Sequence, residues 1–150
     1  ALCDHVFQLF TPVADAAKVT LSCEHPTSEL QIEVDPAKLE QVLLNLLQNA
    51  IEAVEPLGGG KVVARARRRP RTVVIEIEDN GPGLPAPEAP IFDPFFSTKP
   101  SGTGLGLAIV HRIVTDHDGS IDVESTAGRT VFRVVLPIRS PVIQEVTRRR

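Results

Sequence analysis

Residues 102–107 read Gly-Thr-Gly-Leu-Gly-Leu, with glycines at alternate positions, and continue directly into the apolar helical pattern of residues 107–114. Glycine has no Cβ, so successive backbone N–H groups can approach an anion closely, and the positive end of a following helix points at the same place. The dinucleotide fingerprint would need glycine in place of Leu107, and a P-loop would need Gly-Lys-Ser/Thr after a strand. The pattern therefore predicts a phosphate-binding loop of another kind, with a flexible hinge or a tight turn as the alternative.

A second glycine-containing segment, residues 79–83, reads Asp-Asn-Gly-Pro-Gly and follows the β-branched, alternating run of residues 73–78, which predicts a strand. The Asp79 carboxylate can only accept hydrogen bonds, and the exocyclic amine of adenine can donate them. Gly81 and Gly83 would let a flat base come close to the backbone. The segment predicts a base-binding turn, and an ordinary β-turn is the alternative because Asn-Gly and Pro-Gly are common turn pairs.

A helix is predicted from Pro36 to about Glu55, because Asp35 can cap it, Pro36 suits its first position and apolar residues recur at helical spacing. Its opposite stripe is polar, and Asn45 and Asn49 lie four residues apart within it, on one face. Amide oxygens are hard ligands that suit Mg²⁺, whereas a solvated helix face is the alternative. The apolar positions are Leu39, Val42, Leu43, Leu46, Leu47, Ala50, Ile51 and Val54, and the polar stripe is Gln41, Asn45, Gln48, Asn49 and Glu52.

The segment between these glycine-rich stretches is broken by prolines, so it predicts a loop, yet it holds Phe92, Phe95 and Phe96 among the six phenylalanines of the chain. Apolar anchors in an otherwise polar loop predict a lid over residues 85–101 that packs down and can lift, with Lys99 available to a phosphate on closure. A loop fixed to the core by Phe95 and Phe96 is the alternative.

Four segments, taken in order, resemble the N, G1, F and G2 boxes of the catalytic, ATP-binding domain of sensor histidine kinases. They are residues 45–50 (Asn-Leu-Leu-Gln-Asn-Ala), 79–83, 92–96 (Phe-Asp-Pro-Phe-Phe) and 102–107. The resemblance covers about residues 35–137, closes with a glycine-containing turn at residues 128–132, and is nearest to the nitrogen-sensing branch. The wider superfamily also contains gyrase-like and Hsp90-like ATPases.

The resemblance implies a role for each matching residue. Asp79 would bind the adenine amine, Asn49 would hold Mg²⁺ against the triphosphate, and Lys99 would act near the γ-phosphate. Asn45, also implied in nucleotide binding, stands where the hydrolysing relatives have a glutamate base; an amide cannot take a proton from water, so ATP would be kept for transfer. The other residues implied in nucleotide binding are Gly81, Gly83, Phe95, Gly102, Thr103, Gly104, Leu105, Gly106, Leu107 and Thr130, the last through water beside the adenine.

The chain also departs from the family pattern. Glu52 stands where many relatives have a basic residue that reaches the phosphates, so one favourable contact would be missing. Asp118 follows His117 where the family often has glycine, and we interpret His117 as a helix-end residue. The phosphorylated histidine and its two-helix dimerisation hairpin are not recognisable, because His5 lacks the acidic residue and the proline of that motif.

Length and composition agree with one globular domain: 150 residues, of which 42% are apolar and 23% are charged. A formal net charge of −3 argues against a general nucleic-acid binder. Cys3 and Cys23 show no metal spacing and no need for a disulfide, which predicts a reducing, cytoplasmic compartment. No apolar run reaches membrane-spanning length, and the lack of methionine suggests a piece of a longer protein. The arginines at 65, 67, 68, 69 and 71 predict the solvated end of a hairpin, with an anionic partner surface as the alternative.

Periodicity predicts two further helices, over residues 2–17 and from Gly104 to about Gly119, and strands at 19–24, 30–34, 61–68, 72–78, 120–125 and 130–136. These elements favour an α+β fold, a two-layer α/β sandwich whose mixed sheet is covered on one face by three helices. The resemblance implies the Bergerat-type ATP-binding form of that fold. The domain is predicted over residues 1–137, with 138–150 as a flexible basic tail or linker. The first helix would carry Leu2, Val6, Leu9, Phe10, Val13 and Ala17 on one side.

The resemblance implies a histidine kinase catalytic domain that binds Mg-ATP and donates the γ-phosphate to a histidine on a separate dimerisation hairpin. The implied partners are that histidine-containing domain of the parent kinase and a response regulator downstream, with no nucleic acid and no membrane contact, and we expect the isolated chain to be a monomer. One alternative is an ATPase or serine kinase of the same fold. Another is a nucleotide-binding module without catalysis, against which the intact Asn49, Asp79 and glycine boxes count.

Overall fold

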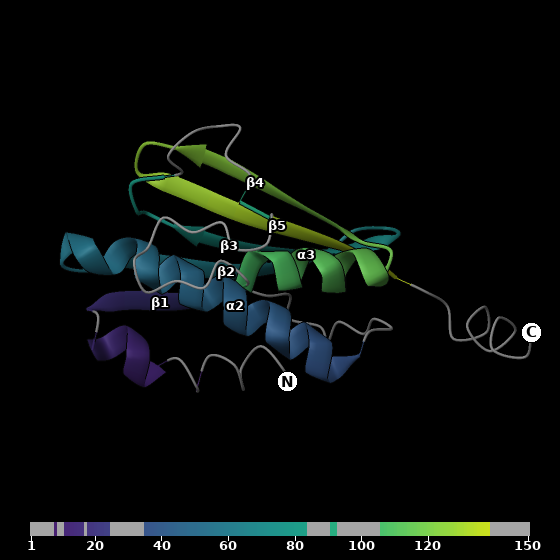
Figure 1. Ribbon diagram of the computed structural model, residues 1–150, viewed down its shortest axis with the longest axis horizontal. Helices are drawn as coiled ribbons and strands as arrows, with labels where there is room; N and C mark the ends of the chain where they lie inside the picture. The colour runs from purple at the N-terminus through teal and green to yellow at the C-terminus, as the bar shows by residue number, and fades with distance from the viewer. Residues whose placement is uncertain are drawn as a thin grey trace, which may run out of the picture.

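The computed structural model describes residues 8, 11–16, 18–24, 35–83, 91–92 and 106–138, with the Cys23 side chain left out. Two long helices, five strands and a short 3₁₀ turn make up this part of the chain (Figure 1). Residues 11–16 are also helical. The bounds are β1 Val19–Glu24, α2 Pro36–Val54, η1 Glu55–Leu57, β2 Gly60–Arg68, β3 Thr72–Asp79, α3 Gly106–Asp116, β4 Ser120–Thr126 and β5 Arg129–Pro137.

The five strands form one mixed sheet in the order β1-β2-β3-β5-β4. β1 runs parallel to β2, and each of the other neighbouring pairs is antiparallel. β3 is therefore the central strand, and Asp79 at its end pairs with Val62 of β2 on one side and with Thr130 of β5 on the other. The register places the end of β3 beside the start of both neighbouring strands.

α2 begins where the sequence predicts. The Asp35 side chain accepts a hydrogen bond from the Ala37 N–H at 3.0 Å, and Pro36 occupies the first turn, where its missing N–H costs nothing. The helix gives way to η1 and ends at Gly58, whose φ of +84° is the left-handed conformation that favours glycine. One stripe of α2 is buried and consists of Val42, Leu43, Leu46, Leu47, Ala50, Ile51 and Val54.

The end of α3 contains Asp118, which stands where the family often has glycine. Asp118 adopts φ +60°, and the Gly119 N–H donates back to the Val114 carbonyl at 2.9 Å. A left-handed residue after the last turn is the usual way to close a helix, and glycine adopts it most easily. His117 is a helix-end residue, as predicted: its Nδ1 lies 2.8 Å from the Ile113 carbonyl oxygen, and its Nε2 accepts from the Asp35 N–H at 3.3 Å.

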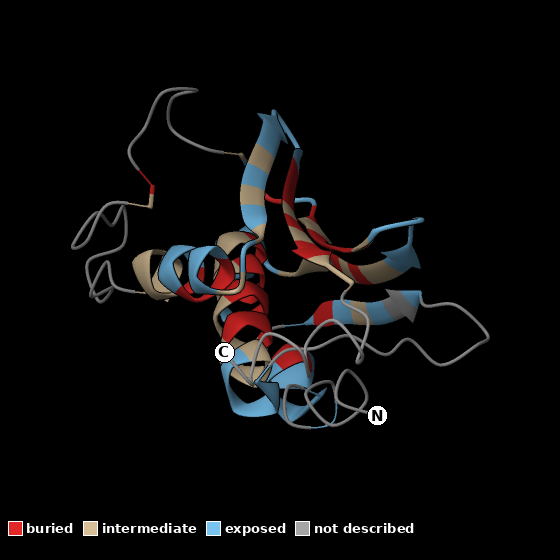
Figure 2. Ribbon diagram, turned by 90° about the vertical axis from the view of Figure 1, so that its right-hand side faces the viewer, coloured by how far each residue is buried: buried red, intermediate tan, exposed pale blue. Residues whose placement is uncertain are grey.

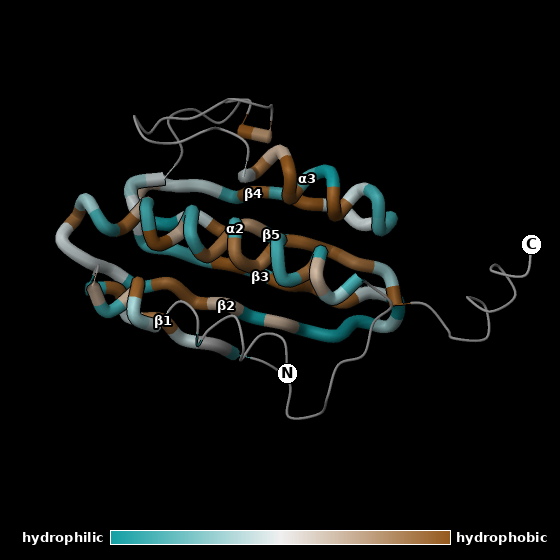
Figure 3. The backbone as a smooth tube through the Cα atoms, turned by 60° about the horizontal axis from the view of Figure 1, so that its bottom comes forward, coloured by the Kyte–Doolittle hydropathy of each residue, from teal (hydrophilic) through white to brown (hydrophobic). Residues whose placement is uncertain are grey.

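The molecule has two layers, with α2 and α3 on one face of the sheet (Figure 2). The buried apolar core lies between the helix layer and the sheet. Its most hydrophobic stretches run along β3 and β5 beneath the helices (Figure 3). Among the described residues, Phe132 has the largest fully buried side chain. Burial of this apolar surface supplies the main stabilisation of the two layers. The α+β, two-layer prediction with a mixed sheet is confirmed.

The opposite face of the sheet is covered by ion pairs. One row runs from Glu24 of β1 to Arg65 of β2 and Glu78 of β3, and ends at Arg129 of β5. A second row joins Arg67, Glu76, Arg133 and Glu124 across β2, β3, β5 and β4. Val74 and Val131 are also buried, although they lie outside the main core cluster. We call these two rows the charge ladder.

Hydrogen bonds within the charge ladder shift pKa values. The hydrogen bond from Arg65 is the main cause that lowers the pKa of Glu78, and the same bond raises the pKa of Arg65. The hydrogen bond to Glu76 is the main cause that raises the pKa of Arg133. The arginine-rich stretch therefore has two parts. Arg65 and Arg67 belong to the charge ladder. Arg68, Arg69 and Arg71 are exposed at the β2–β3 turn, as predicted for the solvated end of a hairpin.

Most predicted elements agree with the structure to within one or two residues at each end. The prediction for Val13 was wrong: its side chain is 42% exposed, and Ala14 is buried in the core instead. The helical spacing alone does not decide which of these two neighbouring positions joins the core. Residues 1–7, 9–10 and 17 of the first helix, the strand at 30–34 and the tail from 139 lie outside the described residues.

Candidate functional site

Asp79 lies at the end of β3 with its side chain only 2% exposed. Its Oδ1 accepts a hydrogen bond from the Gly81 backbone N–H at 2.9 Å, which fixes the carboxylate against its own turn. A buried carboxylate at a strand end is costly unless polar partners meet it. The fixed orientation suits recognition of a hydrogen-bond donor at this edge of the sheet.

The two glycines of this turn are held at close approaches. A Cβ at Gly81 would lie 2.9 Å from Asp79 Oδ1 and 3.0 Å from the Ala53 carbonyl oxygen of α2. A Cβ at Gly83, whose φ is +92°, would lie 2.7 Å from the Thr126 carbonyl oxygen at the end of β4. Only glycine fits at these two positions, because the turn packs closely against α2 on one side and against the β4–β5 hairpin on the other.

Asn45 of α2 lies next to Gly106, at the beginning of α3. Its Nδ2 donates to the Gln41 carbonyl oxygen at 2.9 Å, which leaves Oδ1 pointing at Gly106: a Cβ there would lie 3.2 Å from Asn45 Oδ1. Asn49 lies one turn further along α2, and both asparagines are half-buried, whereas Gln48 of the same stripe is exposed. An amide oxygen next to the N-terminal end of a helix faces the place where an anion binds best.

Thr130 lies beside Asp79 in the β3–β5 ladder and is buried. Its Oγ1 is 3.2 Å from Ser125 Oγ across the β4–β5 hairpin. Sequence reasoning missed Ser125, although the two-residue turn at Ala127 and Gly128 fixes the register that pairs Ser125 with Thr130. Together with Asp79 these hydroxyls form a polar end to an otherwise apolar core, where a base or its water can be hydrogen-bonded.

Two residues of the predicted lid region are described, and both contact the core. Ile91 is buried, and the Phe92 ring lies 5.5 Å from the His111 ring of α3 and 6.4 Å from the Phe132 ring, edge to face with the latter. This part of the segment is anchored between α3 and β5. The predicted anchors Phe95 and Phe96 lie outside the described residues.

The phosphate side of the site is described only in part. Gly106 and Leu107 form the first turn of the described α3, next to Asn45. The residues predicted to complete this side lie outside the part of the chain that the structure describes, and so do the rest of the predicted lid and His5. They are Phe95, Lys99, Gly102, Thr103, Gly104 and Leu105.

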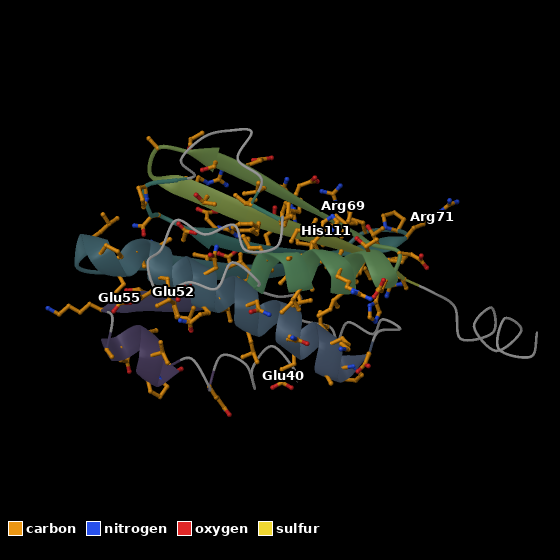
Figure 4. The ribbon with its side chains drawn as sticks, in the orientation of Figure 1. Glu40, Glu52, Glu55, Arg69, Arg71 and His111 are labelled. Atoms are coloured by element: carbon orange, nitrogen blue, oxygen red, sulfur yellow. The ribbon has the colours of Figure 1, made fainter. Side chains whose placement is uncertain are left out.

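Charge is distributed unevenly about this site. Glu52 and Glu55 lie toward the C-terminal end of α2, at the far end of the domain from Arg69 and Arg71 on the β2–β3 turn (Figure 4). Glu52 Oε2 accepts from Gln48 Nε2 at 3.1 Å on the polar stripe of α2. Within the described ranges, no group of three or more His, Cys, Asp or Glu side chains could hold a metal ion by itself.

Comparison with known proteins assigns the family. A profile described as "Histidine kinase-, DNA gyrase B-, and HSP90-like ATPase" (HATPase_c) matches residues 34–140. The sensory histidine kinase/phosphatase NtrB of Rhodobacter capsulatus is 45% identical over 116 residues, which cover 69% of this chain and 33% of NtrB. The chain thus spans about a third of the length of this relative.

Solved structures agree. The catalytic domain of histidine kinase ThkA superposes with a TM-score of 0.82 at 34% identity, covering 91% of this chain and 92% of that domain. Full-length ShkA in complex with AMPPNP gives a TM-score of 0.82 at 31% identity, covering 93% of this chain and 30% of ShkA. The chain belongs to the family of histidine kinase-, DNA gyrase B- and HSP90-like ATPases, and within it to the catalytic ATP-binding domains of sensor histidine kinases.

None of the helices that the structure describes is both long enough and apolar enough to cross a bilayer.

Proposed function

We propose that this domain binds ATP as its Mg²⁺ complex and transfers the γ-phosphate to a histidine carried by a separate helical hairpin of the parent protein. The observation that carries the proposal is the approach of Asn45 Oδ1 to Gly106, because it joins the polar stripe of α2 to the beginning of α3. Asp79 closes the same site from the end of β3. Base recognition and phosphate binding are then separate functions of the two ends of one site.

The adenine would bind against the Asp79–Gly81 turn. One oxygen of the Asp79 carboxylate already accepts the Gly81 N–H, which orients the second oxygen as an acceptor for the exocyclic amine. Gly81 lets this turn pack closely against the Ala53 carbonyl of α2, which fixes the carboxylate relative to the helix, and the buried Thr130 would hold water beside the base. The AMPPNP bound by full-length ShkA, a relative of the same fold, supports a nucleoside triphosphate as the ligand.

The triphosphate would extend from the base toward the start of α3, where backbone N–H groups and the helix dipole favour negative charge. The amide oxygens of Asn45 and Asn49 fit Mg²⁺, since this cation takes few protein ligands and keeps phosphate oxygens and water. Bound there, Mg²⁺ would supply charge neutralisation for the phosphates. Gly102, Thr103, Gly104, Leu105 and Lys99 complete the phosphate contacts in this proposal, on the strength of the sequence pattern.

The side chain at position 45 decides between transfer and hydrolysis. A carboxylate there could take a proton from water, but the amide of Asn45 cannot, and its N–H group is engaged by the Gln41 carbonyl. Phosphoryl transfer depends mainly on holding the acceptor and the γ-phosphate in line. The domain would therefore keep ATP until an acceptor histidine is brought to it.

The partners belong to the same proposal. NtrB is a sensory histidine kinase/phosphatase, and ThkA has been solved in complex with the response regulator protein TrrA. By analogy, a histidine-bearing dimerisation domain of the parent kinase would receive the phosphate, and a response regulator would act downstream. A cytoplasmic location, where ATP is available, completes the proposal.

The test has two steps. Titration calorimetry with ATP should show binding that strengthens in the presence of Mg²⁺. Incubation with radiolabelled ATP should then leave the domain itself unlabelled, whereas addition of the parent hairpin should give acid-labile phosphate on a histidine.

Two results would overturn this assignment. One is robust self-labelling of the domain at His5. The other is brisk ATP hydrolysis that Asn45→Ala abolishes, which would place the chain with the hydrolysing ATPases of the superfamily.

A further inference from the structure

Asn80, directly after Asp79, joins β3 to the start of β2. Its Oδ1 accepts a hydrogen bond from the Lys61 N–H at 2.8 Å, and its own N–H donates to the Lys61 carbonyl oxygen at 3.3 Å. The last backbone pair between these strands is Val62 with Asp79. Asn80 therefore adds one more rung to the ladder, with a side-chain amide oxygen standing in for a backbone carbonyl.

The start of β2 is shaped to receive this side chain. A Cβ at Gly60 would lie 2.5 Å from Asn80 Oδ1 and 2.8 Å from Val54 Cβ, so only glycine leaves room there. The Gly60 N–H donates to the Lys18 carbonyl oxygen at 3.3 Å, which ties the same point to the residue before β1. The Asn80 side chain is thus held against the start of β2, which is itself hydrogen-bonded to Lys18.

The two residues next to Asn80 in the sequence, Asp79 and Gly81, are the ones that would face a bound base. Asp79 supplies the carboxylate, and Gly81 supplies the bare backbone that fits under the Ala53 carbonyl of α2. The hydrogen bond from Gly81 N to Asp79 Oδ1 makes these two residues one unit. Any shift of Asn80 must move that unit relative to α2 and β5.

We propose that Asn80 is a positioning residue for purine selection: docked on Lys61 and Gly60, it holds the Asp79 carboxylate where it distinguishes an adenine amine from a carbonyl. The inference rests on the proposed function, in which Asp79 meets the base. Selection of this kind depends on placing an acceptor to within a fraction of an ångström, because a displaced carboxylate accepts less well from the amine and repels a carbonyl less strongly.

The experiment compares the affinities of the domain for Mg-ATP and Mg-ITP by titration calorimetry; inosine carries a carbonyl oxygen in place of the adenine amine. Asn80→Ala should reduce the preference for ATP on the order of tenfold, chiefly through weaker ATP binding. Asn80→Asp keeps an oxygen that can accept the Lys61 N–H, so it should retain most of the preference. If Asn80 only stabilised the fold, Asn80→Ala would lower the affinities for Mg-ATP and Mg-ITP by the same factor.

Lys61→Ala is the matched control, because Asn80 binds the backbone of Lys61 and not its exposed side chain. It should leave the ratio of affinities unchanged, and thermal unfolding should show that every variant compared is folded. If Asn80→Ala keeps the wild-type ratio while Asp79→Asn loses it, the positioning role is wrong and the adenine assignment stands. If Asp79→Asn also keeps the ratio, the proposed base recognition itself fails.

Discussion

The two faces of β3 each bury a carboxylate, and the two carboxylates are held in different ways. Glu76, 6% exposed on the face with the charge ladder, is clamped by Arg67 at 3.2 Å and Arg133 at 2.7 Å. Asp79, 2% exposed on the helix-covered face, accepts a backbone N–H from the adjoining turn. Two guanidinium groups neutralise Glu76 from within the fold, whereas the Gly81 amide orients Asp79 at the end of the strand.

The two carboxylates are therefore expected to have different roles, Glu76 in the stability of the fold and Asp79 in ligand binding. A buried carboxylate that the fold has paired with cations is costly to break but has little left to offer a ligand. A buried carboxylate oriented by a backbone amide at a strand end, next to a bare glycine turn, retains the capacity to accept a further hydrogen bond. We therefore expect changes at Asp79 to act mainly on nucleotide affinity and changes at Glu76 to act mainly on unfolding.

The largest effect is expected for Asp79→Asn. The amide presents an N–H₂ group or a weaker acceptor to the adenine amine, so the loss in binding free energy should be on the order of 2 kcal/mol or more, about a thirtyfold increase in Kd. Calorimetry with Mg-ATP measures it, and circular dichroism checks that the fold is kept. An unchanged Kd in the folded variant would remove Asp79 from the site.

Glu76→Gln should show the reverse pattern. The neutral amide leaves Arg67 and Arg133 without their shared anion, so the free energy of unfolding should fall by about 1.5 kcal/mol in urea titrations. Affinity for Mg-ATP should stay within twofold, because Glu76 points away from the helix layer.

Glu124 provides the control for this comparison. It lies in the same row of the charge ladder and pairs with Arg133, but its side chain is 59% exposed, so Glu124→Gln should cost less than about 0.5 kcal/mol. If both variants lose equal stability, burial is not what makes Glu76 important. If Glu76→Gln abolishes ATP binding in a folded protein, the two faces are not independent.

Sequence reasoning was most successful where structure is local. α2 was predicted from a capping aspartate, a proline and apolar spacing, all within one segment, and its bounds agree. The order of strands along the chain was likewise readable from alternation. The prediction for Val13 failed because helical spacing alone does not decide which of two neighbouring positions is buried, and Ala14 is the one that belongs to the core.

Contacts between distant segments were beyond the sequence alone. The charge ladder depends on β5 lying next to β3, so that Arg133 reaches Glu76; from the sequence, Arg65 and Arg67 were assigned only to a hairpin end. The approach of Asn45 to Gly106 depends on how α2 and α3 pack. The motifs predicted that such residues belong to one site, but not which atoms meet. The roles of Lys99 and of residues 102–105 stay predictions.

The last prediction concerns Glu78, in the other row of the charge ladder, whose effect should be smaller than that of Glu76. Arg65 at 2.8 Å and Arg129 at 3.3 Å hold the pKa of Glu78 below its ordinary value of 4.5. Since the folded-state pKa is the lower one, this contribution to stability is fully present above about pH 4.5 and is lost as pH falls through the folded value. The group is partly exposed, so the contribution should be below about 1 kcal/mol.

Glu78→Gln tests this pH dependence, because a protonated glutamate and a glutamine are alike in charge. Urea unfolding should show a constant difference between wild type and variant from pH 7 to about pH 5, and the difference should shrink toward zero as the pH falls below about 4.5. ATP affinity at pH 7 should not change. A difference that persists undiminished at pH 3 would mean that Glu78 stabilises the sheet through packing and hydrogen bonding, and that its charge contributes nothing to this face.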